Sequence, residues 1–284
     1  MAISIFRYPG GKSRKSVREK ILSKAPSSFS EYRDPFVGGG GIFWTINSSV
    51  KRWINDKDED LISVYLALRD RPDDFIKKCR EIPPSNKKEA LMATKEGGRA
   101  IYNARLGEKF NELLKDDSDK ALKYFFINRT VFGGRVNYNI PSRLYYSNPN
   151  GWNITVKKNT LESAALKMKD VKVTNEDYSA LLDTEGDDVW VYLDPPYLKN
   201  TNLAESSQLY RHNFTKEDHE MLSIKCEECK HKILISYDDD KEGFIRSLYS
   251  NSRFRIFSES WKYSGTTNSQ KEDGKELIIT NYDV

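Results

Sequence analysis

The alternation of apolar and polar positions along the chain predicts seven strands separated by helical segments. Short apolar runs that end in a polar turn are typical of buried strands, whereas apolar residues spaced three and four apart indicate helices. The expected strands cover about 31–36, 51–55, 170–174, 188–193, 231–237, 253–260 and 275–282. Their alternation with helices predicts an α/β fold with a mixed, mostly parallel sheet and helices on both faces. The loop-rich connection 262–274 allows the last two strands to form an antiparallel pair.

The strand pattern is absent between about 70 and 168, where helical and then loop-like sequence follows. We interpret this region as a helical insertion and expect one domain from residues 1–69 and 169–284, with residues 70–168 as a subdomain. A chain of 284 residues is long enough for both. It contains no internal repeat, no apolar run long enough to span a membrane and no signal-peptide pattern at its start.

The tetrapeptide Asp194-Pro195-Pro196-Tyr197 follows directly after the apolar run 189–193. The Asp194 carboxylate and the Pro195 carbonyl supply two hydrogen-bond acceptors, and Pro196 holds them in a rigid turn. Tyr197 adds an aromatic ring that can stack on a base. Two acceptors beside a ring fit a conjugated exocyclic amine such as adenine N6, although a proline-stiffened turn alone would also explain the motif.

Two further motifs fit a nucleotide-like ligand. Residues 34–43 (DPFVGGGGIF) predict a strand, a glycine turn and a helix with free amide groups at its N-terminus. Asp56 ends the next strand, where an acid can accept hydrogen bonds from ribose hydroxyls. The neighbouring acids at 58–60 have a simpler explanation as the start of a helix. Residues 6–12 (FRYPGGK) lack the P-loop spacing, which excludes a P-loop NTPase. The aromatic residue, the tight turn and the cation of this segment could instead pack around a small cofactor.

In this order, the motifs resemble the Dam-type (class α, D12) N6-adenine-specific DNA methyltransferases. The resemblance spans almost the whole chain and rests on residues 7–12, 34–43, 55–62, 175–178 (NEDY), 194–197, 214–222, 233–237 and 275–282. It implies a Rossmann-like S-adenosylmethionine-dependent methyltransferase fold whose insertion is a target-recognition (DNA-binding) subdomain. It also implies methyl transfer from S-adenosyl-L-methionine to N6 of an adenine flipped out of duplex DNA.

The resemblance assigns residues to the expected site. The catalytic residues are Asp194, Pro195, Pro196 and Tyr197. The cofactor-binding residues are Tyr8, Pro9, Gly10, Gly11, Lys12, Asp34, Phe36, Gly38, Gly40, Asp56, Asp177, Tyr178 and Asp194. Tyr8 stands where the best-studied branch has Trp, and a tyrosine can stack in the same way. The polar segment 198–211 is expected to close over base and cofactor.

DNA contacts must come from local charge, because the net charge is only +4. Residues 120–161 contain seven Lys or Arg and no Asp or Glu, which favours a phosphate-binding surface. The predicted DNA-binding residues are Arg129, Arg135, Asn137, Asn139 and Arg143, since Arg pairs with guanine and Asn with adenine. Tyr124, Phe125 and Ile127 instead fit a buried helix face. Gly133 stands where the best-studied branch has Asn, so GATC is not implied as the target.

A second basic segment near the N-terminus fits an amphipathic helix with Val17, Ile21 and Leu22 directed inward. The three cysteines argue against a disulfide framework. Cys226, Cys229 and His231 suggest zinc, but a structural zinc site requires a fourth ligand. We therefore expect S-adenosylmethionine as the cofactor and no metal.

The expected partner is double-stranded DNA, and the expected state is a monomer, with a weak dimer left open. The expected location is the cytoplasm of a bacterial or phage-infected cell, where a cognate restriction endonuclease is a conceivable functional partner. Three alternatives remain: a cytosine-N4 DNA methyltransferase, an RNA or protein-amide methyltransferase, and a non-enzymatic DNA-binding protein with a relic methyltransferase fold. A nicotinamide-dependent oxidoreductase is disfavoured, because the glycine turn lacks a clear G-x-G-x-x-G.

Overall fold

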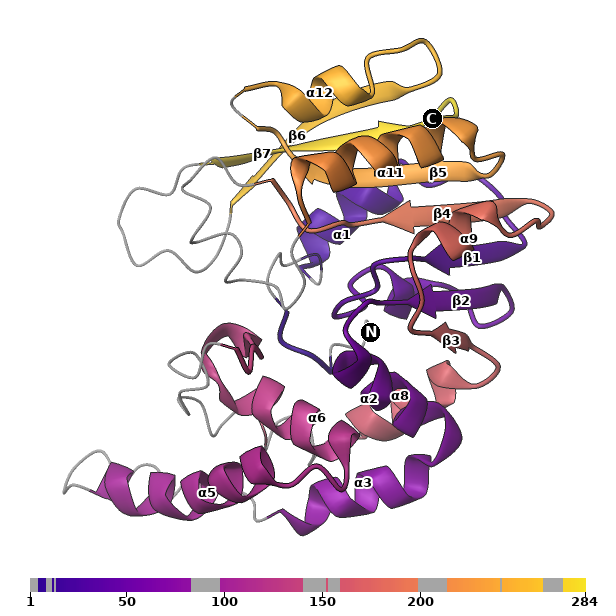
Figure 1. The fold of residues 1–284 in the computed structure, drawn as a ribbon. Helices are drawn as coiled ribbons and strands as arrows, with labels where there is room; N and C mark the ends of the chain where they lie inside the picture. The colour runs from indigo at the N-terminus through magenta and orange to yellow at the C-terminus, as the bar shows by residue number, and fades with distance from the viewer. Residues whose placement is uncertain are drawn as a thin grey trace. The chain divides into compact units, whose positions relative to one another are not determined.

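The computed structural model of the chain (Figure 1) describes residues 5–8, 12, 14–82, 98–139, 152, 159–198, 214–240, 242–262 and 273–284. The chain divides into two compact units. The helical unit comprises Met1–Pro9 and Asp58–Asp170, and the sheet unit comprises Gly10–Lys57 and Val171–Val284. The boundaries expected from the sequence lie instead after residues 69 and 168. The functional division into a catalytic domain and a target-recognition subdomain stays a prediction.

The sheet unit is built on a seven-stranded mixed sheet with the order β3-β2-β1-β4-β5-β7-β6. The neighbours from β3 to β5 are parallel, whereas β7 is antiparallel to both β5 and β6. This confirms the expected mixed, mostly parallel sheet and its terminal antiparallel pair. The strands are β1 (Glu31–Asp34), β2 (Lys51–Asn55), β3 (Lys172–Thr174), β4 (Val189–Leu193), β5 (Lys232–Asp238), β6 (Arg255–Lys262) and β7 (Asp273–Thr280).

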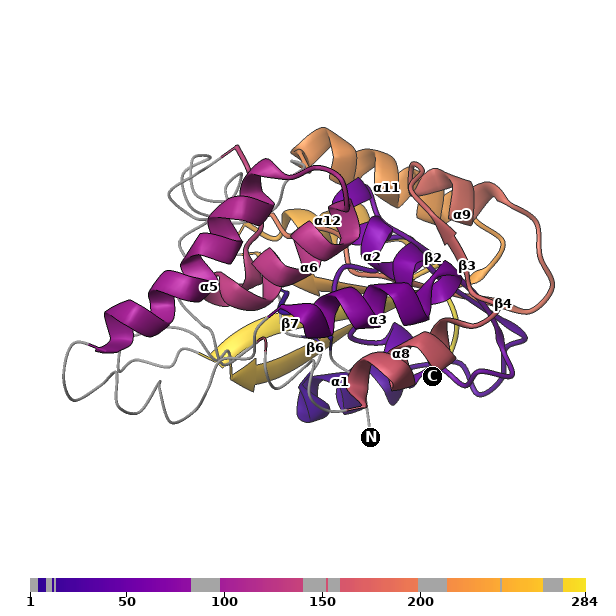
Figure 2. The ribbon, with the colours of Figure 1, turned by 90° about the horizontal axis from the view of Figure 1, so that it is seen from below.

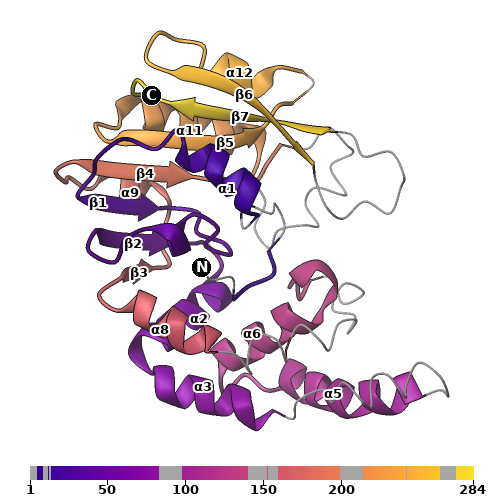
Figure 3. The ribbon, with the colours of Figure 1, turned by 180° about the vertical axis from the view of Figure 1, so that it is seen from behind.

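Helices cover both faces of this sheet. The front and back views (Figures 1 and 3) show α9 (Ser179–Asp183) and α11 (Lys216–Glu228) over one face and α1 (Lys15–Leu22) over the other. A short helix, α12 (Phe244–Leu248), precedes β6. Val17 and Ile21 of α1 are buried as expected, whereas Leu22 is half-buried. Every residue of β4 is buried, because that strand lies in the middle of the sheet between the two helical layers.

The glycine turn after β1 corrects one expectation. A helix was expected after this turn, but only a single 3₁₀ turn forms, η1 (Phe43–Thr45). The Ile46 amide donates to the Phe43 carbonyl at 3.0 Å, and the chain then becomes extended. Asn47 next accepts a hydrogen bond from the Ser49 amide at 3.1 Å. Such a local bond from an Asn side chain competes with helix propagation and ends the helical stretch.

The helical unit contains α2 (Glu59–Asp70), α3 (Pro72–Glu81), α5 (Gly98–Lys115), α6 (Lys120–Thr130), η2 (Phe132–Gly134) and α8 (Thr160–Met168). Both α2 and α3 pack against α6 and α8 (Figure 2). Aromatic rings join them: the ring of Phe125 lies 5.6 Å from that of Phe75 and 5.6 Å from that of Trp152. Tyr124, Phe125 and Ile127 are buried, which confirms the predicted apolar helix face.

The acids before α2 start that helix. Asp58 is its N-cap, and its Oδ1 accepts hydrogen bonds from the Asp60 amide at 3.1 Å and the Leu61 amide at 3.4 Å. Acids in a first turn also complement the helix dipole. This confirms the simpler explanation for residues 58–60 and leaves Asp56 separate from the helix. In the part of the chain that the structure describes, no helix has the length and apolarity needed to cross a membrane.

Candidate active site

The predicted acids gather at one edge of the sheet because parallel strands share their carboxyl edge. Asp34 ends β1, Asp56 follows β2 and Asp194 follows β4. Asp34 interacts electrostatically with both Asp194 and Asp56. The strand order reverses between β1 and β4, and ligands of open α/β sheets bind at such a switch point. The topology therefore places three of the expected site residues at the usual ligand position.

A lysine lies at the centre of the charged groups. Lys12 Nζ is 3.0 Å from Asp194 Oδ1 and 3.6 Å from Glu276 Oε2, and it also donates a hydrogen bond to the Tyr197 hydroxyl. That hydroxyl in turn donates to Glu276 Oε2 at 3.1 Å. We call these four residues the Lys12 cluster. The side chains of Lys12 and Glu276 are only 5% and 0% exposed, whereas that of Asp194 is 24% exposed.

The charge on Lys12 is maintained by its partners. Burial acts to lower the pKa of Lys12, but the carboxylates of Asp194 and Glu276 outweigh it and raise the pKa above its ordinary value. Lys12 is therefore a cation held between two carboxylates. Glu276 was not among the residues expected from the sequence, although an acid at the start of the apolar run 277–279 was the available signal.

The Asp194 carboxylate is oriented through one of its oxygens. Oδ1 accepts hydrogen bonds from Lys12 Nζ and from Ser236 Oγ, both at 3.0 Å. The Tyr192 hydroxyl lies 2.9 Å from Ser236 Oγ and donates to it, since the Ser236 proton is directed at Asp194. Among the described residues, none donates a hydrogen bond to Oδ2. The two lone pairs of Oδ1 are thus used within the protein, and Oδ2 is left as an acceptor.

The remaining residues of the tetrapeptide lie close around this carboxylate. Pro195 is buried, and Pro196 and Tyr197 are half-buried. The Tyr197 ring centroid lies 4.5 Å from Lys12 Nζ and 6.1 Å from the Tyr237 ring centroid. Tyr197 is therefore held both through its hydroxyl and through its ring.

Asp34 is the most buried of the edge carboxylates. Its Oδ2 accepts a hydrogen bond from the Tyr32 hydroxyl at 2.8 Å, whereas its Oδ1 is buried and has no hydrogen-bond partner in the described part of the chain. Burial raises the pKa of Asp34 well above its usual value, and the neighbouring carboxylates of Asp194 and Asp56 add to the effect. Such an acceptor favours a ligand that brings a donor or a positive charge.

The glycine turn brings the backbone close to this edge. Gly38 and Gly40 have φ of 46° and 72°, in the left-handed region that glycine tolerates. The Gly38 amide donates to Asp56 Oδ2 at 2.9 Å. A Cβ on Gly41 would lie 2.8 Å from Lys12 Cβ, so glycine there lets Lys12 pass beside the turn.

Three aromatic rings pack together in an aromatic box. Phe36 follows β1, Tyr178 follows β3 and Phe214 precedes α11. Phe36 stacks on Tyr178 with centroids 5.4 Å apart, and Phe214 packs against them at 5.8 Å and 6.1 Å respectively. Burial raises the pKa of Tyr178 to about 12, so its hydroxyl stays protonated. Asp177 is exposed and accepts hydrogen bonds from the Ser179 amide and hydroxyl. Phe214 lies in the segment 214–222 that carries the family resemblance, but it was not predicted as a site residue.

The predicted DNA-binding residues lie in the helical unit and differ in exposure. Arg129 is buried, and burial, with the nearby charge of Arg7, lowers its pKa to about 10. Asn137 is also buried and accepts a hydrogen bond from the Asn139 amide at 3.0 Å. Arg135 is half-buried and Asn139 is exposed, so these two reach the surface of the unit. Arg143 lies outside the described residues.

The turn before Arg135 is shaped by two glycines. Gly133 has φ of 66°, in the left-handed region that glycine readily adopts. A Cβ on Gly134 would lie 2.2 Å from the Arg7 carbonyl oxygen. Asn128 fixes this approach: it accepts from the Arg7 amide at 3.0 Å and donates to the Arg7 carbonyl at 2.7 Å. Asn128 was not among the residues predicted for the site.

The other predicted site residues lie in the helical unit or outside the described residues. Tyr8 belongs to the helical unit, and Pro9, Gly10 and Gly11 lie outside the described residues, as does the segment 199–211. Cys226 and Cys229 are buried thiols, and His231 Nε2 lies 2.9 Å from the Thr184 carbonyl oxygen. Over the described ranges, no group of three or more His, Cys, Asp or Glu is arranged to hold a metal ion.

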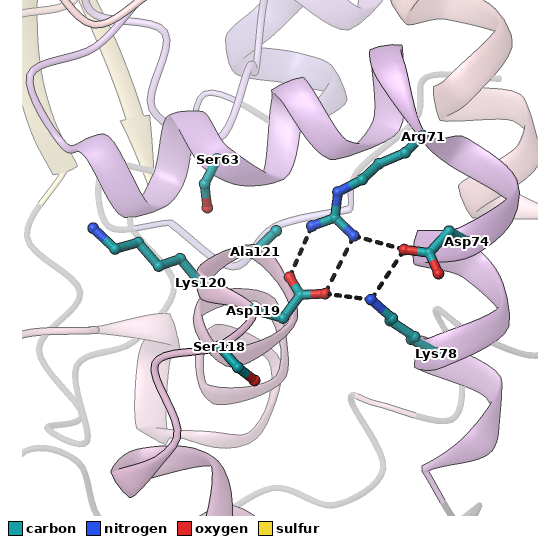
Figure 4. A pocket seen from close by; sticks show the side chains of 8 residues that line it. All are labelled: Ser63, Arg71, Asp74, Lys78, Ser118, Asp119, Lys120 and Ala121. Atoms are coloured by element: carbon teal, nitrogen blue, oxygen red, sulfur yellow. Dashed lines mark hydrogen bonds and ion pairs between the residues drawn. The ribbon is translucent and has the colours of Figure 1, made fainter.

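The helical unit contains a pocket lined by a second charged cluster (Figure 4). Asp119 lies 2.8 Å from Arg71 Nη2 and 3.1 Å from Lys78 Nζ, and Asp74 contacts both cations. We call these four residues the Asp119 cluster. Asp119 Oδ1 also accepts from the Leu122 amide at 3.2 Å and so caps α6. The two cations and the two carboxylates balance one another. Because Arg71 and Asp74 lie at the start of α3 and Asp119 caps α6, the cluster joins the N-terminal ends of these two helices.

Comparison with known proteins places the chain among enzymes of one chemistry. A family model described as D12 class N6 adenine-specific DNA methyltransferase matches residues 8–265. The type II methyltransferase M1.LlaDCHI of Lactococcus lactis subsp. cremoris is 25% identical, over 97% of this chain and 94% of that protein. The DNA adenine methylase of Escherichia coli strain K12 is 26% identical, over 87% and 84%. The DNA N-6-adenine-methyltransferase of Escherichia phage P1 is 26% identical over 89% of this chain and 32% of that longer protein.

Proposed function

The chain belongs to the D12 class of N6-adenine-specific DNA methyltransferases, and from this premise we propose that the carboxyl edge of the sheet binds S-adenosylmethionine and an adenine turned out of duplex DNA. Membership of the family answers a question that the tetrapeptide leaves open: the reaction is methylation of adenine N6 in DNA, rather than of cytosine N4. The observation that carries the proposal for the site is Asp194, fixed through Oδ1 and with Oδ2 left to accept.

The residues at the edge fit the proposed cofactor. When bound, S-adenosylmethionine supplies a methyl group that the positive sulfonium makes electrophilic. The buried, unpartnered Oδ1 of Asp34 suits an ammonium donor, and Asp56 beyond β2 suits ribose hydroxyls. Phe36 and Tyr178 supply an apolar wall. The proposed cofactor set also keeps Tyr8, Pro9, Gly10, Gly11, Lys12, Gly38, Gly40, Asp177 and Asp194.

The tetrapeptide holds the target base in this proposal. Asp194 Oδ2 and the Pro195 carbonyl accept the two amino hydrogens of adenine, which directs the nitrogen lone pair out of conjugation. Tyr197 stacks on the base. Flipping an adenine from duplex DNA costs a few kcal/mol. Stacking of one base on an aromatic side chain is worth about 1–3 kcal/mol, which offsets part of that cost.

The helical unit is the proposed source of sequence recognition. We assign this role to Arg129, Arg135, Asn137, Asn139 and Arg143, with Arg135 and Asn139 as base-reading candidates because they reach the surface. An Arg135→Ala variant should weaken DNA binding by about 1–3 kcal/mol and relax sequence preference, while S-adenosylmethionine binding is unchanged. Arg80→Ala is a matched control, because Arg80 lies in the same unit but is paired with Glu162.

The direct test uses the intact protein and an Asp194→Ala variant. Each is incubated with unmethylated genomic DNA and labelled S-adenosylmethionine, and the product is analysed by nucleoside mass spectrometry and single-molecule sequencing. We expect N6-methyladenine at one short sequence with the intact protein only. Undiminished methylation by a folded Asp194→Ala variant would contradict the assignment of Asp194, and labelled N4-methylcytosine would contradict the proposed substrate.

A further inference from the structure

We propose that Glu276 is a positioning residue for methyl transfer, which shares the charge of Lys12 so that Lys12 does not cancel the charge of the Asp194 carboxylate that faces the target amine. The inference rests on the proposed function of the carboxyl edge. Glu276 touches two residues of that site at once: its Oε2 lies 3.6 Å from Lys12 Nζ and accepts the hydrogen bond of the Tyr197 hydroxyl at 3.1 Å.

Burying the Glu276 carboxylate in the sheet costs free energy, which indicates that the residue has a role other than packing. Its side chain is fully buried, and it directly precedes the apolar core residues Leu277, Ile278 and Ile279 of β7. Removing a carboxylate from water costs several kcal/mol, which a single ion pair seldom returns. An apolar residue at this position would serve the core better. The cation that Glu276 faces, Lys12, is equally buried and therefore needs this partner.

The charge of Glu276 changes the net charge of the Lys12 cluster around Asp194. Lys12 contributes one positive charge, and Asp194 and Glu276 contribute one negative charge each, so the cluster carries a net negative charge. Without the charge of Glu276, Lys12 would pair with Asp194 alone and the cluster would become neutral. Water is scarce around these side chains, so this difference is weakly screened.

The reaction needs that negative charge at one moment. As the N6–CH3 bond forms and the bond from sulfur to that carbon breaks, the positive charge passes from sulfur to N6. N6 then releases one proton, which passes through Asp194 to water. A carboxylate that is not neutralised by Lys12 stabilises the positive charge that develops on N6.

The same contact fixes the ring that stacks on the base. The Tyr197 hydroxyl accepts from Lys12 and donates to Glu276, so both of its hydrogen-bonding functions are used within the cluster. Loss of Glu276 leaves that donor without its partner.

The test compares two glutamates that face each other across neighbouring strands. Glu259 of β6 is directly opposite Glu276 in the register and pairs with Lys20 at 2.9 Å, where its side chain is 26% exposed. Glu276→Gln should lower kcat by about 10- to 100-fold, the loss that one misplaced contact at a reacting centre can cause. The equilibrium binding of S-adenosylmethionine should be unchanged within about twofold. Glu259→Gln should leave kcat within about twofold of the wild type.

Two further variants separate a charge role from a packing role. Glu276→Asp keeps the charge and should retain more kcat than Glu276→Gln, which keeps the shape. In a Lys12→Met background, Glu276→Gln should change kcat by less than about twofold, because the charge of Glu276 acts through Lys12 and the glutamine oxygen can still accept from the Tyr197 hydroxyl. This second pair also covers a failure of the single Glu276→Gln variant to fold, since the double variant contains neither the buried cation nor the carboxylate of Glu276.

Different results would overturn the role of Glu276 and the proposed function of the site. A wild-type kcat in folded Glu276→Gln, or a further tenfold loss from Glu276→Gln in the Lys12→Met background, would overturn the role of Glu276. Absence of N6-methyladenine with the wild-type protein would instead overturn the proposed function of the site.

Discussion

The sheet unit and the helical unit each contain a cluster of four side chains with paired charges, and the two clusters differ in burial and balance. The Lys12 cluster has one cation for two carboxylates, and its Lys12 and Glu276 are buried. The Asp119 cluster has two cations for two carboxylates, and its side chains are 14–48% exposed. Balanced, solvated pairs suit a structural role, whereas a buried cluster with excess charge is costly and suits a role in chemistry.

The carboxylates of the two units also respond in opposite ways to their surroundings. Burial raises the pKa of Asp34 well above its usual value. Burial also acts to raise the pKa of Asp119, but hydrogen bonds from Arg71, the Leu122 amide and Lys78 outweigh it and lower that pKa. Asp119 is thus satisfied by the protein itself, whereas Asp34 keeps one buried oxygen, Oδ1, with no hydrogen-bond partner among the described residues.

Apart from Asp194 itself, Tyr197 gives the largest expected effect among the variants that sharpen this contrast. Tyr197→Ala removes the stacking surface and should lower kcat/KM by about 10- to 100-fold, given 1–3 kcal/mol per stacked base. Tyr197→Phe keeps the ring and removes only the hydroxyl bonded to Lys12 and Glu276, so its loss should be smaller. A duplex with 2-aminopurine at the target position measures base flipping in parallel. Equal losses in both variants would argue against stacking as the main role of the ring.

Asp119→Ala should affect stability and leave chemistry alone. The variant loses the N-cap of α6, worth about 1 kcal/mol, together with half-exposed ion pairs worth about 0–1 kcal/mol each. We expect unfolding of the protein to become easier by about 1–3 kcal/mol, measured by urea denaturation. The methyl-transfer rate of the folded protein should change by less than about twofold. A loss of rate with unchanged stability would contradict the structural role.

The pH dependence of stability should have opposite signs for the two aspartates. A carboxyl whose pKa is raised by folding costs stability as pH rises above its unfolded pKa of about 4. Asp34→Asn should therefore raise the thermal midpoint of the ligand-free protein at pH 7, with the gain fading below about pH 4. A carboxyl whose pKa is lowered contributes stability above that pH and loses it as pH falls further. Asp119→Asn should lower the midpoint at pH 7, and the deficit should shrink in acid. Thermal scans of both variants across pH 3–8 check the signs.

Lys120 should show the smallest effect. It lines the same pocket as the Asp119 cluster, but it pairs only with Glu59 at 3.6 Å, and both side chains are more than half exposed. Lys120→Ala should change the free energy of unfolding by less than about 0.5 kcal/mol, and added salt should remove the difference. A loss above 1 kcal/mol would show that the pocket rim, and not only Asp119, holds the helices together.

The sequence predicted those parts of the fold that depend on local patterns. Apolar runs such as 189–193 marked the strands, and each acid after a parallel strand fell at the same edge because strand direction decides it. The burial of Tyr124, Phe125 and Ile127 followed from their spacing along one helix. The tetrapeptide at 194–197 was recognisable because its acceptors are adjacent in sequence.

The remaining features depend on contacts between distant segments. Glu276 joins the site only because β7 inserts antiparallel between β5 and β6, and it meets Lys12 from the other end of the chain. Asn128 holds the Arg7 backbone, a contact that no spacing predicts. Topology, and not composition, decides both of these cases.

The helix expected after the glycine turn fails for a local reason, because the Asn47 side chain accepts from the Ser49 amide and competes with helix propagation.

The most direct measurement compares Asp194→Asn with Asp119→Asn, two identical substitutions in the two charged clusters. Single-turnover methyl transfer and thermal unfolding are recorded for both, with saturating S-adenosylmethionine and unmethylated target DNA. We predict that Asp194→Asn lowers the transfer rate by at least about 100-fold with a near-native thermal midpoint. Asp119→Asn should lower the midpoint and retain the rate. A slow but fully stable Asp119→Asn variant, or an active Asp194→Asn variant, would contradict the assignment of catalysis to the carboxyl edge of the sheet.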